Sequence, residues 1–315
     1  MKKVLVTGAA GAIGLQVIKY LLAEGKYEIT AIDLKSKGVI QKLRRYKRRV
    51  NVLYGDISDR ILIEALVKDH NIIIHLASTL PPLADMKRGL ADIVDYQGTE
   101  NIIRAISYYN PKCHLFYAST TSMYKDKVDP TVKSKIELQE YDYFSLAKYN
   151  TEKLIKEKLK NYTIYRIPLV LCNPLTEPFM FHVKKNSIID VITKEDAAYS
   201  FVKGIKYIDK LNRKTFNVCG EESILYKDLL KQILKIIGLS WNYVFNRLFI
   251  EKNYYSPVCA DKDDLNNIIN YRNDSITEYY KRLRSRVKNR KFAKFLAKPL
   301  INLKVERSEN NGKSI

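Results

Sequence analysis

Residues 3–14 read Lys-Val-Leu-Val-Thr-Gly-Ala-Ala-Gly-Ala-Ile-Gly, an apolar run followed by three glycines at the spacing G-x-x-G-x-x-G. The run has the length of a buried strand, and an apolar helical face follows it, made of Ile13, Val17, Ile18, Leu21 and Leu22. A strand, a tight turn and a helix whose first amide groups point outward form a binding site for an anion such as a pyrophosphate. We expect Gly8 to permit the turn, Gly11 to let the backbone approach the ligand, and Gly14 to let the helix pack on the strand.

The second predicted strand, residues 28–33, ends in an acidic residue, Asp33. A carboxylate at this place accepts hydrogen bonds from the ribose hydroxyls of adenosine and repels a 2′-phosphate. The sequence therefore predicts a dinucleotide site that favours NAD over NADP, although Lys35 and Lys37 follow closely and weaken that preference. The alternative is a glycine turn in some other α/β protein.

The chain of 315 residues is long enough for a large domain with a smaller lobe. No apolar run reaches the roughly 18–20 residues that a membrane-spanning helix needs. Residues 1–6 imitate the start of a signal peptide, but their apolar part is too short and leads directly into the glycine turn. We therefore expect a cytoplasmic protein.

The formal net charge of +21 indicates an acidic partner, such as an anionic membrane, a polyanion or a phosphorylated substrate. A compositional bias toward lysine is the alternative interpretation. The cysteines, Cys113, Cys172, Cys219 and Cys259, are scattered without a C-x-x-C pair. They are typical of core residues in a reducing compartment, so we expect no metal site.

Predicted strands at residues 50–54, 71–78 and 114–118 alternate with predicted helices. This alternation predicts an α/β fold, a Rossmann-type doubly wound parallel sheet with a smaller C-terminal substrate lobe. The expected boundaries are 1–173 for the NAD-binding domain, 174–275 for the lobe, with the chain returning to the Rossmann core, and 276–315 for a basic C-terminal helix and tail. Within the lobe the pattern predicts a helix over 226–237.

Several separate motifs resemble one family over roughly residues 3–280: Thr7-Gly8-x-x-Gly11-x-x-Gly14, Asp33, Gly55-Asp56, His75-Leu76-Ala77, Gly98-Thr99-x-Asn101, Ser119-Thr120 and Lys148. The chain is similar to the extended short-chain dehydrogenase/reductases of the NAD-dependent epimerase/dehydratase family, whose commonest substrates are nucleotide sugars. The resemblance implies cofactor contacts from Gly8, Gly11, Ala12, Ile13, Gly14, Asp33, Asp56, Ile57, Leu76, Ala77, Ser78, Lys148 and Pro168.

The resemblance also implies a reaction in which a hydride passes between a sugar carbon and the nicotinamide. In the family a tyrosinate removes the hydroxyl proton, a lysine one helical turn later lowers that tyrosine's pKa, and a Ser or Thr hydroxyl positions the substrate. Thr120 and Lys148 match two of these catalytic groups, but Phe144 occupies the tyrosine position. Tyr143 should face elsewhere on a helix, and Tyr141 lies about 10 Å along the axis.

Two further positions depart from the family pattern: Asp95 and Leu169 stand where members usually carry asparagine. Arg247 and Arg272 are candidate ligands for a substrate phosphate. Three functions stay open. The first is an NAD-binding nucleotide-sugar epimerase or dehydratase with altered chemistry, the second is a silenced member that binds the dinucleotide as a sensor, scaffold or partner subunit, and the third is a peripheral membrane protein whose basic tail is its main feature.

The segment 281–301 combines many lysines and arginines with Phe and Leu residues and contains no acidic residue. This composition suits peripheral contact with an anionic membrane surface. A solvated helix that docks on its own domain is the alternative, and the lack of a known nucleic-acid module disfavours RNA or DNA. By resemblance, the helix of Lys148 is also expected to form a homodimer interface.

Overall fold

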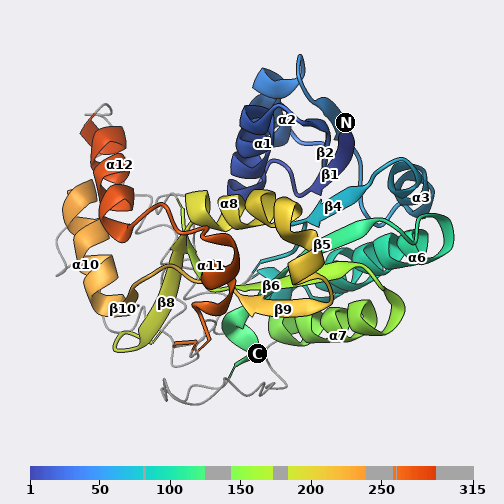
Figure 1. Cartoon of the computed structure of the whole chain (residues 1–315). Helices are drawn as coiled ribbons and strands as arrows, with labels where there is room; N and C mark the ends of the chain where they lie inside the picture. Colours follow the sequence, from blue (N-terminus) through green and yellow to red (C-terminus); the bar gives the residue numbers. More distant parts are fainter. Residues whose placement is uncertain (81–82, 125–142, 173–183, 239–257, 260, 289–315) are drawn as a thin grey trace.

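The computed structural model describes residues 1–80, 83–124, 143–172, 184–238, 258–259 and 261–288. A large sheet with helices on both faces occupies one side of the molecule, and a smaller lobe lies beside it (Figure 1). The predicted arrangement of a main α/β body with a smaller lobe is confirmed.

The main sheet has seven parallel strands in the order β3-β2-β1-β4-β5-β6-β9. Their bounds are β1 (Lys2–Thr7), β2 (Tyr27–Asp33), β3 (Asn51–Tyr54), β4 (Ile72–His75), β5 (His114–Thr120), β6 (Tyr162–Ile167) and β9 (Lys214–Asn217). The chain first builds outward from β1 to β3, then returns to build β4 and β5 on the other side. This reversal between β1 and β4 is the point at which open α/β sheets bind their ligands, outside the carboxyl ends of the strands.

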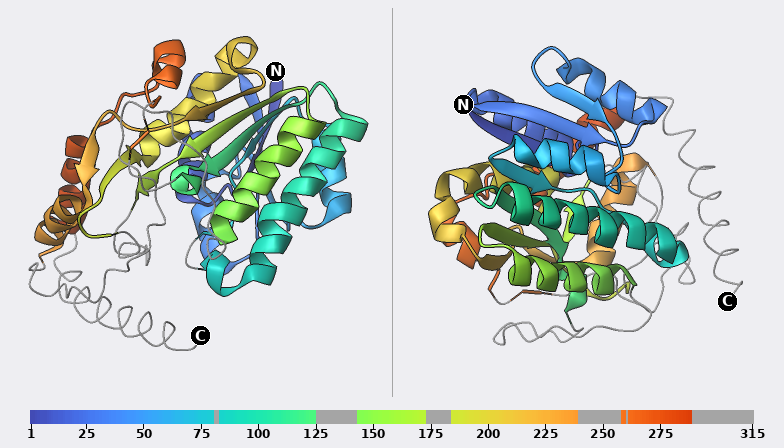
Figure 2. Two further views of the ribbon diagram at one scale, coloured as in Figure 1. Left: turned by 90° about the horizontal axis from the view of Figure 1, so that it is seen from below. Right: turned by 90° about the vertical axis from the view of Figure 1, so that its right-hand side faces the viewer.

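Both faces of the sheet are covered, as the two views of Figure 2 show. One face carries α1 (Ala12–Glu24) and α8 (Lys194–Gly204), and the other carries α3 (Arg60–Lys68), α6 (Thr99–Tyr109) and α7 (Tyr143–Lys158). Side chains alternate along β1, so that Val4 and Val6 pack toward α1 and Leu5 toward α3 and α6. A strand that is buried on both faces reads as continuously apolar, which explains the run at 4–6.

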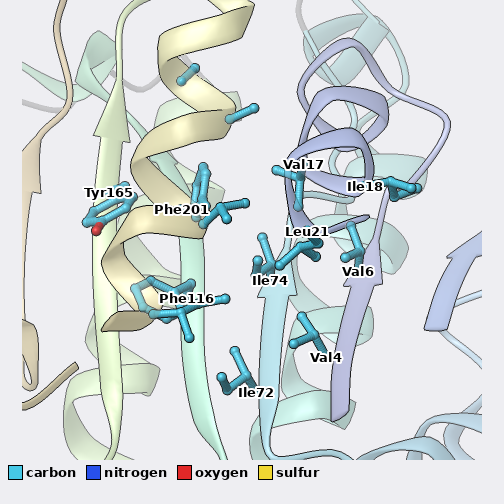
Figure 3. Packing of buried hydrophobic residues seen from close by; sticks show 14 of the residues in the cluster. Val4, Val6, Val17, Ile18, Leu21, Ile72, Ile74, Phe116, Tyr165 and Phe201 are labelled. Atoms are coloured by element: carbon cyan, nitrogen blue, oxygen red, sulfur yellow. The ribbon is translucent and has the colours of Figure 1, made fainter. Parts of the chain in front are cut away.

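The core on the first face is formed where α1 and α8 lie over the central strands. Figure 3 shows Val17 and Leu21 of α1 and Phe201 of α8 directed toward the strands that carry Ile74 and Phe116. All five side chains are fully shielded from solvent. Burying an aliphatic or aromatic side chain contributes about 1.5–3 kcal/mol, so this cluster anchors α1 firmly on the sheet.

In the turn after β1, Gly8 and Gly14 have the conformation and the close packing that were expected from the sequence. Gly8 has φ +63°, a conformation that residues with a side chain rarely adopt. A Cβ atom at Gly14 would lie 2.4 Å from the carbonyl oxygen of Gly8 and 2.8 Å from that of Ala9. Only glycine therefore allows α1 to start so close to the end of β1.

Short elements connect the larger ones. They are α2 (Lys37–Leu43), η1 (Arg44–Tyr46), α4 (Leu83–Met86), α5 (Arg88–Ala91), the π-helix η2 (Asp92–Gly98), η3 (Thr121–Met123), η5 (Ile205–Tyr207), α9 (Ile208–Leu211) and α11 (Asp264–Ile269). The helical segment at 92–109 thus begins as the π-helix η2 and continues as α6. The side chain of Asp59 caps α3 and that of Thr193 caps α8.

Within the described residues, the smaller lobe contains a three-stranded sheet in the order β10-β8-β7 and two longer helices. The elements are β7 (Leu169–Leu171), β8 (Ile188–Thr193), β10 (Ser223–Leu225), α10 (Tyr226–Ile237) and α12 (Ile276–Lys288). Tyr279, Leu283 and Val287 of α12 are buried in the same apolar cluster as α10. The change of composition near residue 275 therefore does not mark the end of the lobe. No helix within the described ranges is long and apolar enough to cross a membrane.

The close approach at Gly14 yields a stability prediction. Gly14→Ala should lower the free energy of unfolding by about 1–3 kcal/mol, because the added methyl group overlaps two backbone carbonyls. Chemical denaturation followed by circular dichroism measures the change. Gly38→Ala is the matched control: Gly38 also lies in a helix, and its added methyl group meets no atom within 4 Å. Equal stability of the two variants would contradict the packing argument.

Candidate functional site

A cleft with a cavity volume of about 530 Å³ runs along the carboxyl ends of β1, β2, β4 and β5. Every cofactor residue predicted from the sequence lines this cleft, namely Gly8, Gly11, Ala12, Ile13, Gly14, Asp33, Asp56, Ile57, Leu76, Ala77, Ser78, Lys148 and Pro168. Thr120 and Phe144 line it as well. The structure therefore brings residues from distant parts of the sequence to one continuous surface; their roles as ligands remain predictions.

The central part of the cleft is the N-terminus of α1. Gly11 occupies the N-cap position without a side-chain cap, and no acidic residue lies in the first turn. The first amide groups of the helix and its positive dipole end are thus available to an anion. Gly8 and Gly11 add no side chains to the surface, so the backbone can approach a pyrophosphate.

The adenosine end of the cleft is organised by Asp33. One of its carboxylate oxygens accepts the N–H of Ala10 at 2.8 Å and the other that of Leu34 at 2.8 Å, which fixes the carboxylate at the end of β2. Both oxygens keep lone pairs for ribose hydroxyls. The glycine turn, the free helix amides and this oriented carboxylate fit a dinucleotide such as NAD.

Sequence reasoning missed several residues at this end. Lys42 extends from α2 and donates to the carbonyl of Ala10 at 3.2 Å, and Leu34 and Val39 supply apolar lining. In the sequence Lys42 belongs to a densely basic segment and has no distinguishing signal. Only the folding of α2 back over β2 places it beside Asp33.

At the opposite end, Lys148 of α7 is buried at the ends of β4 and β5. Its ammonium group donates to the carbonyl of Ala118 at 3.1 Å and lies 3.4 Å from the Asp95 carboxylate. The ring centroid of Phe144, one turn earlier on the helix, lies 5.9 Å from the Lys148 Nζ. Phe144 packs with Ala84 and Ala91 and occupies the cleft surface on the same side of the helix as Lys148.

Asp95 is the departure from the family pattern with the clearest structural effect. Its side chain is 1% exposed, and it accepts hydrogen bonds from the Ser78 hydroxyl and, at 2.9 Å, from the N–H of Thr79. Burial lowers the pKa of the Lys148 ammonium, and Asp95 opposes that change. The two charges therefore depend on each other within a site closed to solvent.

None of the described tyrosines presents its phenol to the cleft. Tyr143 donates to Asp92, Tyr124 donates to Asn217 at 2.7 Å, and Tyr117 is fully buried beneath Lys148. Burial, together with Asp95, raises the pKa of Tyr117 well above its usual range. Tyr141, the other tyrosine considered from the sequence, lies outside the described residues. Among the residues that the structure describes, no tyrosine lines the cleft.

Thr120 ends β5 and lines the same end of the cleft as Phe144 and Lys148. Its hydroxyl oxygen accepts the N–H of Ser122 at 3.1 Å and lies 2.9 Å from the Ser122 hydroxyl, which in turn lies 2.7 Å from that of Ser145. This chain of hydroxyls joins the end of β5 to the start of α7. Thr120 is thus held in place, and it keeps one oxygen lone pair or its proton for a ligand.

A buried ion pair that the sequence did not reveal fixes α7 against the sheet. Glu152, one turn after Lys148, accepts two hydrogen bonds from Arg166 at 2.8 and 2.6 Å and one from Ser119 at 2.6 Å. Burial alone would raise the pKa of Glu152, but Arg166 and Ser119 lower it. A charged residue four positions after Lys148 on the buried side of a helix is the signal that could have identified this pair.

Of the two proposed phosphate ligands, the structure describes only Arg272. Arg272 donates to the carbonyl of Cys219 at 3.0 Å, to that of Lys262 at 2.6 Å, and to Asp263, and it does not line the cleft. Its guanidinium thus connects backbone segments, and it is not presented to a ligand. Arg247 lies outside the described residues. Leu169 is buried in the lobe's apolar cluster.

The cysteines are free thiols. Cys219 and Cys259 lie within 4.8 Å of each other and of the Asp190 carboxylate in a buried group. The carboxylate already accepts the Ser223 hydroxyl at 2.6 Å and the N–H of Cys259 at 2.7 Å. A hydrogen bond to Cys259, together with burial, raises the pKa of Cys219 and keeps it a neutral thiol. This chemistry is that of a satisfied polar core.

Comparison with known proteins places this site in context. A family model described as "NAD dependent epimerase/dehydratase family" matches residues 4–195, the part of the chain that contains the cleft. A UDP-N-acetyl-alpha-D-glucosaminuronate decarboxylase of Bacillus cytotoxicus is 28% identical over 130 residues, 41% of this chain and 40% of the relative. A dTDP-glucose 4,6-dehydratase of Mycolicibacterium smegmatis is 32% identical over 129 residues, 39% of this chain and 38% of the relative. The matched region thus spans about two fifths of these curated relatives.

A solved structure extends the similarity in fold to nearly the whole chain. The structure is that of a Tyr→Phe mutant of UDP-glucuronic acid 4-epimerase from Bacillus cereus, in complex with UDP-4-deoxy-4-fluoro-glucuronic acid and NAD. It matches with a TM-score of 0.73 and 18% identity over 91% of this chain and 99% of the other. The agreement confirms the predicted fold.

The geometry of Asp33 predicts its effect on cofactor choice. Asp33→Asn should weaken NAD binding by about tenfold, because the amide has fewer acceptor sites for the ribose hydroxyls. The variant should also reduce the difference in affinity between NAD and NADP, because the charge that repels a 2′-phosphate is gone. Fluorescence titration with both cofactors measures the two effects. Asp69→Asn, an exposed carboxylate paired with Lys3, is the control, and an equal loss in both variants would refute the assignment.

Proposed function

Because this chain belongs to the NAD-dependent epimerase/dehydratase family, we propose that it binds NAD along the cleft and a nucleotide sugar at the nicotinamide end, without the tyrosinate step of its relatives. NAD is the cofactor of the family, which agrees with the prediction from Asp33. The substrate class and the loss of turnover are the parts that we propose.

In this proposal three features hold the cofactor. The N-terminus of α1 faces the pyrophosphate, Asp33 faces the adenosine ribose, and Lys148 faces the nicotinamide ribose. All three are fixed before any ligand arrives: the helix by its glycine packing, Asp33 by two backbone amides and Lys148 by Ala118. Preorganised groups of this kind lose little entropy on binding, which favours affinity.

The proposed loss of proton transfer rests on one observation. Phe144 occupies the tyrosine position beside Lys148, and no tyrosine among the described residues lines the cleft. Bound NAD supplies a hydride acceptor, but the substrate hydroxyl must also lose its proton. Phenylalanine cannot accept a proton, and loss of a general base typically reduces the rate by about 10²–10⁴-fold. Binding is unaffected by this loss.

The proposed ligand class rests on the relatives. Their described substrates are UDP- and dTDP-linked sugars, and the Bacillus cereus Tyr→Phe mutant binds both a nucleotide-sugar analogue and NAD. This complex supports the view that the fold can hold both ligands in a protein with a tyrosine replaced by phenylalanine. A dinucleotide-dependent sensor, scaffold or partner subunit would use such binding.

Hydride exchange by altered chemistry is the second candidate function. The observation in its favour is that Thr120 and Lys148, the other two groups of the family's catalytic set, both line the cleft. In that case another acceptor would take the substrate proton. The two candidates differ in turnover but not in cofactor binding.

Two proposed partner surfaces differ in what supports them. For a homodimer, Leu90 of α5 and Ile93 and Tyr96 of η2 leave apolar side chains exposed on a helical segment that contacts α7. For an anionic membrane, α12 directs Arg284 and Arg286 outward, but its apolar side is buried in the lobe. Within the described residues, α12 thus presents positive charges to a membrane, while its apolar side chains are not available for insertion into the lipid.

We expect wild-type protein to bind NAD in a calorimetric titration and to release no product from UDP-glucose, UDP-glucuronic acid or dTDP-glucose. Lys148→Met should weaken NAD binding by about tenfold, because it removes the proposed donor to the nicotinamide ribose. Lys153→Met, on the exposed side of the same helix, is the control. Product formation by wild type that Thr120→Ala abolishes would contradict the proposal and support the second candidate.

A further inference from the structure

The ion pair between Lys148 and Asp95 crosses from α7 to η2 at the nicotinamide end of the cleft. The Nζ–Oδ1 distance is 3.4 Å, and the two side chains are 4% and 1% exposed. Because both side chains are so deeply buried, each charge is compensated mainly by the other, and removing one leaves the other uncompensated. Where the family pattern has a lysine beside a neutral asparagine, this chain has a lysine paired with a carboxylate.

Asp95 is fixed in this position by the protein around it. The Ser78 hydroxyl and the Thr79 amide donate to its two carboxylate oxygens. Its backbone carbonyl accepts the Thr99 hydroxyl at 2.8 Å and the Thr151 hydroxyl at 3.2 Å. Thr151 belongs to α7, so these bonds also tie η2 to the helix that carries Lys148. The carboxylate cannot swing away from the ammonium group without breaking them.

The other titratable groups near Lys148 do not replace Asp95 as its partner. Burial and the nearby Lys148 charge lower the pKa of His75 on β4 to about 3, so this histidine is neutral near pH 7. Tyr117 on β5 presents its ring to the ammonium group at 4.9 Å and keeps its proton. Glu152, on α7 itself, is committed to Arg166. Asp95 on η2 is therefore the carboxylate that compensates Lys148.

Resting on the proposed function, we propose that Asp95 is a second determinant of the silenced site: it compensates the charge of Lys148, so that a phenol restored at position 144 does not by itself become a proton acceptor. In the family pattern an asparagine stands at this position, and the lysine charge acts on the tyrosine. In this chain the absence of the tyrosine and the presence of the Asp95 carboxylate both work against proton transfer.

The charges of Lys148 and Asp95 have opposite effects on a phenol at position 144. A nearby cation stabilises a phenolate and lowers the phenol's pKa, whereas a nearby anion does the opposite. With Asp95 in place, a phenol at position 144 meets both charges of the pair, and their effects largely cancel. With asparagine at position 95 the competing anion is gone, and a phenolate at position 144 becomes the anion that compensates the buried Lys148 ammonium. A shift of one pKa unit changes the ionised fraction of the phenol about tenfold.

The experiment compares Phe144→Tyr with Phe144→Tyr/Asp95→Asn, each with NAD bound. Ultraviolet difference titration against the parent without the added phenol gives the pKa of that phenol alone. We expect this pKa to be at least about one unit lower in the double variant, with turnover of nucleotide sugars at least about tenfold higher near pH 7. Phe144→Tyr/Asp95→Ser removes the same charge with a smaller side chain and should show the same shift.

Phe144→Tyr/Asp92→Asn is the matched control, because Asp92 is a carboxylate of the same π-helix that pairs with Tyr143 rather than Lys148. It should leave the phenol pKa where Phe144→Tyr places it. An equal pKa in Phe144→Tyr and both Asp95 variants would overturn the inference, and the proposed function would stand. Turnover by the wild type would overturn the proposed function, and the pKa difference between the variants would still decide the role of Asp95.

Discussion

The close approach of α1 to the end of β1 is the constraint on which the cleft depends. Gly8 turns the chain through a conformation that other residues rarely adopt, and Gly14 leaves room for the helix against two backbone carbonyls. Val17 and Leu21 then anchor α1 on the sheet, so that its N-terminus stays at the carboxyl ends of the strands. An anion site built from backbone alone cannot be adjusted by side chains, and its position has to come from this packing.

The two ends of the cleft differ in how their charged side chains are arranged. At the adenosine end Asp33 is a half-exposed carboxylate with acceptor capacity to spare, as a ligand with two ribose hydroxyls requires. At the nicotinamide end the charges of Lys148 and Asp95 are turned toward each other, and Phe144 adds an apolar surface. In the proposed function the first arrangement favours binding, and the second lacks the charge imbalance and the proton acceptor that proton transfer needs. Binding without turnover is the simplest function that accommodates both.

The cofactor cleft was predictable from the sequence because its determinants are local. The glycine spacing, the strand that ends in Asp33 and the alternation of strands with helices each act over a few residues, and together they predict the sheet and the surface at its edge. The partners contributed by tertiary structure were not predictable. Lys42 reaches the cleft only because α2 folds back over β2, and the pairing of Asp95 with Lys148 requires η2 to lie against α7. In α12 the buried residues are dispersed among basic ones, so that its place in the lobe was hidden by composition.

The most direct test of binding without turnover is a single-turnover measurement. Protein at a concentration equal to that of NAD is incubated with a nucleotide sugar, ultraviolet absorbance follows the formation of reduced nicotinamide, and proton NMR follows the sugar ring. We predict that NAD is bound, as shown by broadening of its nicotinamide resonances, that no reduced nicotinamide forms, and that the sugar keeps its configuration. Reduced nicotinamide, or an epimerised or dehydrated sugar, would contradict binding without turnover, because a hydride would then have left the sugar.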